Sequence, residues 1–159
     1  MHAITRENLI RKIEILPSQI EALVHGLMPA QLTTHYLAHE WTVAQNVHHL
    51  FDSHANSYVR CKLIMTEENP PLKAYDQDKW AFLADASQAD IANSLALLAA
   101  LHQRWVIFWS NLAEPDFART GLHSQNGLVR LDQLLAVYAD HGEAHIDQIT
   151  RTLAASGSA

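Results

Sequence analysis

Apolar residues repeated at helical spacing constrain this chain more than any other feature. The clearest stripe covers residues 131–154, where one helical face carries Leu131, Leu134, Leu135, Tyr138, His141, His145 and Ile149. Similar stripes cover residues 5–27, 42–67 and 88–112. Apolar residues form 48% of the 159 residues, enough for one sizeable core. The sequence therefore predicts an all-α four-helix bundle, with residues 1–159 as a single domain.

The segments between these stripes differ in length and character. Pro17 should kink or interrupt the first helix, because proline cannot donate the helical hydrogen bond. Residues 28–41 form a connector, and residues 70–85 form a long connection with two aromatics that suits a lid or pocket wall. Residues 117–130 predict a small hairpin or an irregular loop before the last helix. Residues 155–159 are expected to form a disordered tail.

Charge and cysteine content exclude several classes of protein. The formal net charge is −6 with only 11 lysines and arginines, which argues against a nucleic-acid partner. The lone Cys61 cannot form an internal disulfide, which is typical of a reducing compartment. Residues 1–8 lack the apolar core of a signal peptide, and no apolar stretch is long enough to span a membrane. We therefore expect a cytoplasmic protein with neither a membrane nor a nucleic acid as partner.

Two histidines interrupt the apolar stripe of the last helix. His141 and His145 are four residues apart, so their Cβ atoms lie about 5–6 Å from each other and both rings can bind one metal ion. Burying two unpartnered imidazoles costs a few kcal/mol, whereas a shared metal satisfies both. The alternative is a pair of core histidines satisfied by hydrogen bonds. His35 and His39 have the same spacing but lie in a connector without periodicity, so we expect them to be exposed to solvent.

A third ligand is expected from the second helix. His48, His49 and His54 are the candidates, and spacing does not choose between them. Of the adjacent His48 and His49, only one should point inward. Three histidine ligands leave a coordination position vacant, which is typical of catalytic rather than structural metal sites.

Several fragments in a fixed order resemble a known family. They extend from about Ile13 to Ile149 and comprise Trp41-Thr42-Val43, residues 48–54, 58–62 and 66–70, Lys73-Ala74-Tyr75-Asp76 with Trp80, residues 102–105, and residues 138–145. With these fragments the chain resembles the DinB superfamily of metal-binding four-helix bundles, and its YfiT-like branch in particular.

The resemblance implies a site and an activity. It maps the metal ligands to His49, His141 and His145, with one divalent ion per chain, zinc or nickel, often in a homodimer. It implies a metal-dependent hydrolase acting on a small molecule. Some relatives are instead thiol S-transferases that use low-molecular-weight thiols such as bacillithiol. A third possibility is a metal-binding bundle without turnover.

Further residues are candidates for handling the substrate. Those expected to orient it are Arg60, Tyr75, Asp76, Trp80 and Arg104; the alternative is a structural role in an Arg–Asp pair and in aromatic packing beside the bundle. Asp52 lies one turn from His49 and could support that ligand or accept a proton, or it could be a solvated charge.

Overall fold

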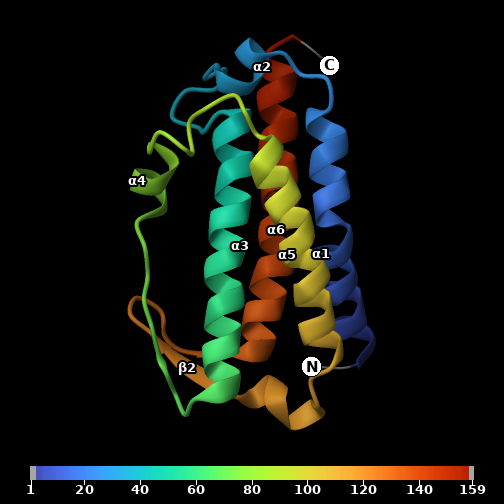
Figure 1. The fold of residues 1–159 in the computed structure, drawn as a ribbon, viewed down its shortest axis with the longest axis vertical. Coiled ribbons are helices and arrows are strands. Elements are labelled where there is room, and N and C mark those ends of the chain that lie inside the picture. The colour runs from blue at the N-terminus through green and yellow to red at the C-terminus, as the bar shows by residue number, and fades with distance from the viewer. Residues whose placement is uncertain (1–2, 158–159) are drawn as a thin grey trace.

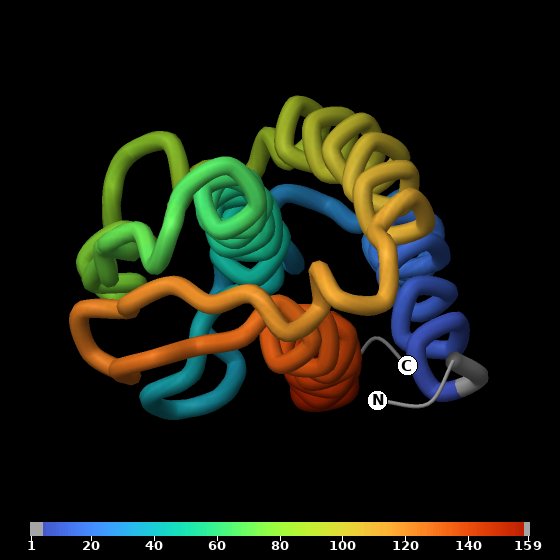
Figure 2. Tube along the Cα trace, turned by 90° about the horizontal axis from the view of Figure 1, so that it is seen from below, coloured from blue at the N-terminus to red at the C-terminus, as the bar shows by residue number. Residues whose placement is uncertain are grey.

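Four long helices set the long axis of the molecule (Figure 1). The computed structural model describes residues 3–157, and its long helices are α1 (Ala3–Val24), α3 (Val43–Thr66), α5 (Ala92–Ser110) and α6 (Leu131–Ala155). Helix α1 packs against α5 and α6, and α3 packs against the same two helices, so the four form a closed ring (Figure 2). The predicted four-helix bundle is confirmed.

The long connection after α3 follows from the direction of the helices. Helices α3 and α5 run the same way along the bundle, so the chain must return along its length between them (Figure 1). The return contains a short strand, β1 (Pro71–Leu72), and a short helix, α4 (Gln77–Ala81). The connector before α3 likewise contains a short helix, α2 (Pro29–Thr33).

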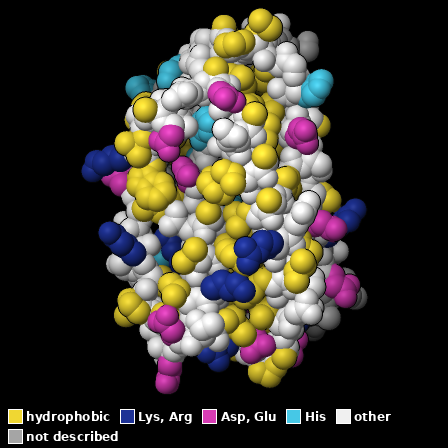
Figure 3. Space-filling model, viewed as in Figure 1, with side chains coloured by type: hydrophobic (Ala, Val, Ile, Leu, Met, Phe, Trp, Pro, Cys, Tyr) yellow, Lys and Arg dark blue, Asp and Glu magenta, His cyan; other side chains and the backbone are white. Residues whose placement is uncertain are grey.

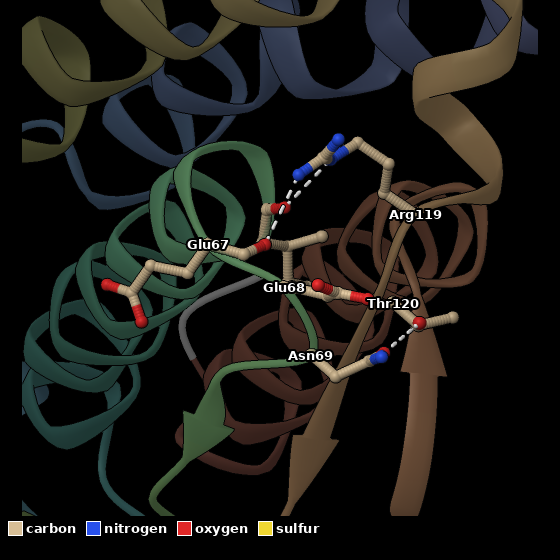
Figure 4. Close-up of a pocket in the computed structure, with 6 residues that line it drawn as sticks. Glu67, Glu68, Asn69, Arg119 and Thr120 are labelled. Carbon is tan, nitrogen blue, oxygen red and sulfur yellow. Dashed lines mark hydrogen bonds between the residues drawn. The ribbon is translucent and has the colours of Figure 1, made fainter.

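Both ends of α3 are fixed by side chains. At the first turn the Thr42 hydroxyl accepts from the Gln45 backbone N–H at 3.2 Å, and the Gln45 side chain accepts from the Thr42 N–H at 3.0 Å. This reciprocal capping box satisfies two amides that have no helical partner. At the last turn Arg119 donates to the carbonyls of Ile64 and Glu67 (Figure 4). The helix that carries three of the candidate histidines is therefore held in register at both ends.

A small sheet lies beside α3 and α6 near one end of the bundle (Figure 1). Strands β2 (Thr120–His123) and β3 (Gly127–Arg130) form an antiparallel hairpin, which confirms the hairpin alternative for this segment. Strand β1 pairs parallel to β2, with Pro71 opposite Leu122, so the strand order is β1-β2-β3. A 3₁₀ turn, η1 (Glu114–Ala118), precedes the hairpin. The sheet holds the start of the long connection beside the start of α6.

Of the kink or interruption predicted at Pro17, the interruption is wrong, because α1 runs without a break from Ala3 to Val24. Proline has no N–H, so the carbonyl of Ile13, four residues earlier, loses its helical donor. His102 of α5 supplies a donor instead, with its Nδ1 2.5 Å from that carbonyl oxygen. A hydrogen bond between helices thus replaces the one that proline removes.

The core is divided into two apolar clusters by histidines. One cluster includes Ile13, Ile64, Trp105 and Leu135, and the other includes Ile20, Val47, Leu98 and Ile149. On each of α3, α5 and α6 a histidine lies between the residues of the two clusters. We call this group the histidine layer; it consists of His54, His102 and His141.

The last helix is longer than expected and reaches Ala155, so Ala155 does not belong to a disordered tail. Residues 158–159 of that predicted tail lie outside the described residues. No helix among residues 3–157 is both long and apolar enough to cross a membrane. On the face shown in Figure 3, acidic and basic side chains are interspersed, and hydrophobic ones gather beside α4. Phe82 and Leu83, just after α4, are among the exposed hydrophobic residues.

Candidate metal centre

Three imidazole nitrogens converge on one point between α3 and α6. The Nε2 atom of His141 lies 3.1 Å from Nε2 of His145 and 3.3 Å from Nε2 of His49. The possible ligand atoms of the three residues all lie within 4.8 Å of one another. The structure therefore brings together the three residues to which the family resemblance assigns the metal.

Packing around the cluster explains its position. His141 and His145 occupy consecutive turns of α6, and the Trp41 ring lies 4.6 Å from the His49 ring and 6.2 Å from the His145 ring, centroid to centroid. The Trp41 ring thus packs against two of the three imidazoles.

Of His48 and His49, only His49 points to the converging nitrogens, as expected, although both side chains are buried. His48 turns to the opposite side of α3, with its Nδ1 2.8 Å from the Ser94 hydroxyl and its Nε2 3.0 Å from the Gln88 carbonyl. Since α3 packs against α6 on one side and α5 on the other, adjacent residues can both be buried. His35 and His39 are exposed, as predicted.

Hydrogen bonds set which nitrogen of His145 carries the proton. The Asn46 side-chain amide donates to the Thr42 carbonyl at 2.9 Å, so its oxygen faces Nδ1 of His145 at 2.7 Å. Nδ1 must therefore be the protonated nitrogen, and Nε2 presents a lone pair to the other two rings.

The cluster fits a divalent metal. A proton can be shared by at most one pair among the three converging nitrogens, whereas a cation satisfies all three. Nitrogen ligands about 2.0–2.1 Å from a tetrahedral zinc ion lie roughly 3.3 Å apart. The observed spacings of 3.1 and 3.3 Å are close to this value.

Burial keeps the three rings neutral. It lowers the pKa of His141 to about 4. Burial, with a smaller contribution from the neighbouring histidines, lowers the pKa of His49 to about 3 and that of His145 to about 2. Imidazoles bind metals only as neutral rings, so at neutral pH no proton has to leave before an ion binds.

His141 lies where two clefts meet. The larger has a volume of about 610 Å³ and is lined by residues that include Arg60, Tyr75, His123 and Tyr138. The smaller, of about 330 Å³, includes Trp41, His49 and His145 in its lining. A molecule in the larger cleft would contact His141, whereas one in the smaller cleft would contact all three histidines.

Arg60 and Tyr75, two of the predicted substrate residues, form one wall of the larger cleft. Arg60 is only 8% exposed, and its Nη2 donates to the Lys73 carbonyl at 2.6 Å. Its guanidinium carbon lies 5.9 Å from the centre of the Tyr75 ring. Within residues 3–157, Arg60 forms no ion pair with a carboxylate. Its positive charge is thus buried beside the cleft without a compensating anion.

Two other predicted substrate residues have structural partners. Asp76 caps α4 by accepting from the Lys79 N–H at 3.0 Å, and it forms an ion pair with the Lys79 side chain, although it also lines the larger cleft. Trp80 packs against Tyr75 with 4.5 Å between ring centroids, and it is absent from the lining of both clefts. Trp80 fits the aromatic-packing alternative, whereas Asp76 pairs with Lys79 rather than with an arginine.

Two predicted site residues lie elsewhere. Arg104 is exposed on the outer face of α5, above the Tyr58 ring. Asp52 lines a separate cleft with His48 and Asp85, and burial, followed by the nearby Asp85, raises its pKa. Asp52 is one turn from His49 in sequence, but it lines the cleft on the His48 side of α3 and does not belong to the group of converging ligands.

Sequence reasoning missed the residues that support the ligands. Asn46, His102 and His123 were not singled out, and His54 was considered only as a possible ligand. A signal was present for Asn46, because Asn46, His49 and Ser53 follow one another at helical spacing and all three are buried. No signal within α5 distinguishes His102 from a satisfied core histidine, because its partners lie on α1 and α3.

Comparison with known proteins adds an independent line of evidence. A sequence model of the DinB superfamily matches residues 12–149. A protein of Oceanobacillus iheyensis named "Putative metal-dependent hydrolase" is 43% identical over 141 residues, which cover 89% of this chain and 81% of that protein. A protein of Halalkalibacterium halodurans with the same designation is 40% identical over 144 residues, covering 91% and 84% of the two chains.

One solved structure shares the whole fold. YfiT from Bacillus subtilis, described as a probable metal-dependent hydrolase with an unusual four-helix bundle topology, superimposes with a TM-score of 0.95 at 36% sequence identity. The match covers 100% of this chain and 91% of that chain. The parallel course of neighbouring helices α3 and α5 is therefore shared with a known bundle.

Proposed function

Because this chain belongs to the DinB superfamily, we propose that it is a metal-dependent enzyme, and specifically a hydrolase of small molecules. His49, His141 and His145 would hold one divalent ion, zinc or nickel, per chain. The observation that carries the proposal is the convergence of three neutral imidazole nitrogens beside two adjoining clefts. All three rings line the cleft of about 330 Å³, and His141 also lines the cleft of about 610 Å³. A purely structural metal site would be closed, whereas this one adjoins space for a substrate.

A divalent ion held by His49, His141 and His145 would keep its full charge and would lower the pKa of a water or thiol bound to it. The chain's own residues have other tasks. Asn46 holds the His145 ring so that its lone pair faces the other two converging nitrogens. Trp41 packs against the rings of His49 and His145.

The larger cleft favours a substrate that carries an anionic group. Burial of an unpaired charge costs several kcal/mol, and an incoming carboxylate or phosphate would compensate Arg60. His123 lies nearby in the same wall, and its Nδ1 accepts from the backbone N–H groups of Gln125 and Asn126. Its proton is therefore on Nε2, which gives the cleft a second hydrogen-bond donor.

The size and charge of the cleft favour a second candidate, thiol S-transfer. A small anionic thiol could place its charged group on Arg60 and its sulfur near the histidines, because thiolates are strong ligands for soft and borderline metal ions. Cys61 cannot serve as the thiol, since it is fully buried and burial raises its pKa to about 12.

The cell compartment and oligomeric state are further parts of the proposal. A cytoplasmic location agrees with the single, reduced cysteine. A homodimer would cover the exposed hydrophobic side chains of Phe82 and Leu83. Sedimentation of the purified chain measures the second point directly.

Turnover by the metal-loaded chain tests the function. The zinc-loaded and nickel-loaded proteins are assayed on panels of anionic esters, amides and phosphoesters, and on electrophiles supplied with small anionic thiols. We expect turnover that disappears in the folded His145→Ala variant and persists in His48→Ala, whose ring lies on the other side of α3. A metal ion that raises thermal stability but supports no turnover in either panel would instead indicate a non-catalytic metal-binding bundle.

A further inference from the structure

Behind the three converging nitrogens, the histidine layer forms a continuous chain of hydrogen bonds across the bundle. The Nδ1 atom of His141 lies 3.1 Å from Nε2 of His54, and Nδ1 of His54 lies 2.8 Å from Nε2 of His102. The far end is the 2.5 Å contact between Nδ1 of His102 and the Ile13 carbonyl. The chain thus connects α6, α3, α5 and α1 in turn.

The Ile13 carbonyl at the far end determines which nitrogen donates in each hydrogen bond of the series. A carbonyl oxygen only accepts, so Nδ1 of His102 must be the nitrogen that carries its proton. In a neutral ring Nε2 of His102 is then an acceptor, which requires Nδ1 of His54 to donate. By the same step Nε2 of His54 accepts from Nδ1 of His141. His141 is left with an unprotonated Nε2, the nitrogen that faces His49 and His145.

The surroundings allow only this arrangement. His54 is 0% exposed and His102 is 1% exposed, so a charged ring at either position would be costly. The rings of His54 and His102 lie nearly parallel, at an interplanar angle of 9° with 4.9 Å between centroids, and Trp105 and Tyr138 pack edge-on against His54. Pro17 contributes by removing the helical donor to the Ile13 carbonyl, which leaves that oxygen for His102.

We propose that His54 and His102 are positioning residues that hold His141 in its metal-binding tautomer, through a one-way hydrogen-bond chain anchored at the Ile13 carbonyl. Within residues 3–157, no hydrogen bond or ring contact joins His102 to His49, His141 or His145. His102 therefore acts through His54. Its role in metal affinity rests on the proposed function, whereas the tautomers it imposes exist in the metal-free protein.

The first test reads the tautomers directly. Long-range proton–nitrogen correlation spectra of the metal-free, ¹⁵N-histidine-labelled chain show which nitrogen of each ring is protonated. We expect Nδ1 to be protonated in His102, His54 and His141. Protonation of His141 at Nε2, or rapid averaging between its two tautomers, would overturn the proposal without any variant having to fold.

A matched pair of substitutions at His102 tests the consequence for metal binding. In His102→Leu the His54 ring loses its acceptor and can reverse, so zinc affinity should fall about 10- to 100-fold, the usual effect of losing a supporting hydrogen bond to a metal ligand. In His102→Gln the side-chain oxygen can still accept from His54, and affinity should remain within about threefold of the native value. Dissociation constants come from competition with a chelator, and urea unfolding of the metal-free variants checks that both fold.

The outcomes separate the two proposals. If the native chain binds zinc, and His102→Leu binds it equally tightly with the His141 tautomer unchanged, the positioning role is wrong and the metal site stands. If the native chain binds no metal, the proposed function fails, while the spectra of the metal-free chain still decide the direction of the hydrogen bonds.

Discussion

At the scale of single residues, the candidate centre depends on side chains that orient others. Asn46 fixes the tautomer of His145 because its own amide is fixed by the Thr42 carbonyl. The Asn46 amide has partners for its oxygen and its nitrogen, whereas the buried charge of Arg60, beside a cleft, has no carboxylate partner among the described residues. Asn46 orients a proposed metal ligand, and Arg60 places an unpaired positive charge in the wall of the cleft.

Removing the Asn46 amide should weaken metal binding more than it weakens the fold. In Asn46→Ala the Thr42 carbonyl keeps its helical donor, the Asn46 backbone N–H, but His145 loses its acceptor. We expect zinc affinity to fall about 10- to 100-fold, measured by chelator competition. Asn56→Ala is the control, because Asn56 makes the equivalent bond to a carbonyl four residues earlier on α3, without contacting a histidine. Equal affinities for both variants would contradict the role given to Asn46.

The Arg60 charge should lower the stability of the fold and raise the turnover of anionic substrates. Replacing a buried charge that lacks a partner by an apolar side chain of similar length removes a desolvation cost. In Arg60→Met we expect the free energy of unfolding to stay unchanged or to rise by up to about 4 kcal/mol, while turnover of anionic substrates falls. Arg104→Met, on the exposed face of α5, should change neither. A loss of more than about 1 kcal/mol in urea unfolding of Arg60→Met would show that the fold itself requires this charge.

At the scale of elements, local rules predicted most of the architecture. The four stripes gave the four helices, and Thr42 marked the start of α3, because these signals act within one or two turns. Pro17 was misjudged, since its consequence depends on His102 from another helix. Asp52 and Arg104 were predicted to lie at the site but lie outside it, for a related reason. The sequence indicates which residues share one face of a helix, but the helix packed against that face is determined by the assembled bundle.

The capping box at the start of α3 should contribute measurable stability. Its first turn is buried beneath Trp41 and α4, so water cannot replace the Thr42 hydroxyl. We expect Thr42→Ala to lower the free energy of unfolding by about 1 kcal/mol, within a range of about 0.5–2. Thr66→Ala is the control at the other end of the same helix, where the hydroxyl is exposed and bonds only to carbonyls of its own helix. Identical urea midpoints for the two variants would rule out a stabilising cap.

At the scale of the whole molecule, the bundle accommodates a polar layer between two apolar clusters. Burial lowers the pKa of His102 to about 4 and that of His54 well below its usual range. The sequence showed the histidines one by one, and the pair on α6 indicated a metal. The layer as a unit could not be predicted, because its members come from three helices whose relative heights are set by packing.

The layer and the metal ligands together predict how the metal-free chain responds to acid. Their folded pKa values lie below the unfolded value near 6.5, so below this pH the unfolded chain binds more protons than the folded one. Stability is therefore complete above about pH 6.5 and is lost as pH falls towards the folded pKa values, by about 1.4 kcal/mol per pH unit for each buried histidine. Urea unfolding from pH 7.5 to 4.5 measures the slope. His145→Leu should reduce this slope by about 1.4 kcal/mol per pH unit, the contribution of one histidine. A slope near zero in the native chain would contradict the burial of these histidines as neutral rings.

The most direct test of the central claim is the metal content of the chain. Protein purified without an affinity tag or chelator is analysed for zinc and nickel by elemental mass spectrometry, beside a His141→Ala/His145→Ala double variant. A metal centre formed by His49, His141 and His145 predicts about one ion per native chain and none in the variant. A native chain that holds no metal, even after incubation with zinc or nickel, would contradict the account and leave the converging histidines as a hydrogen-bonded core cluster.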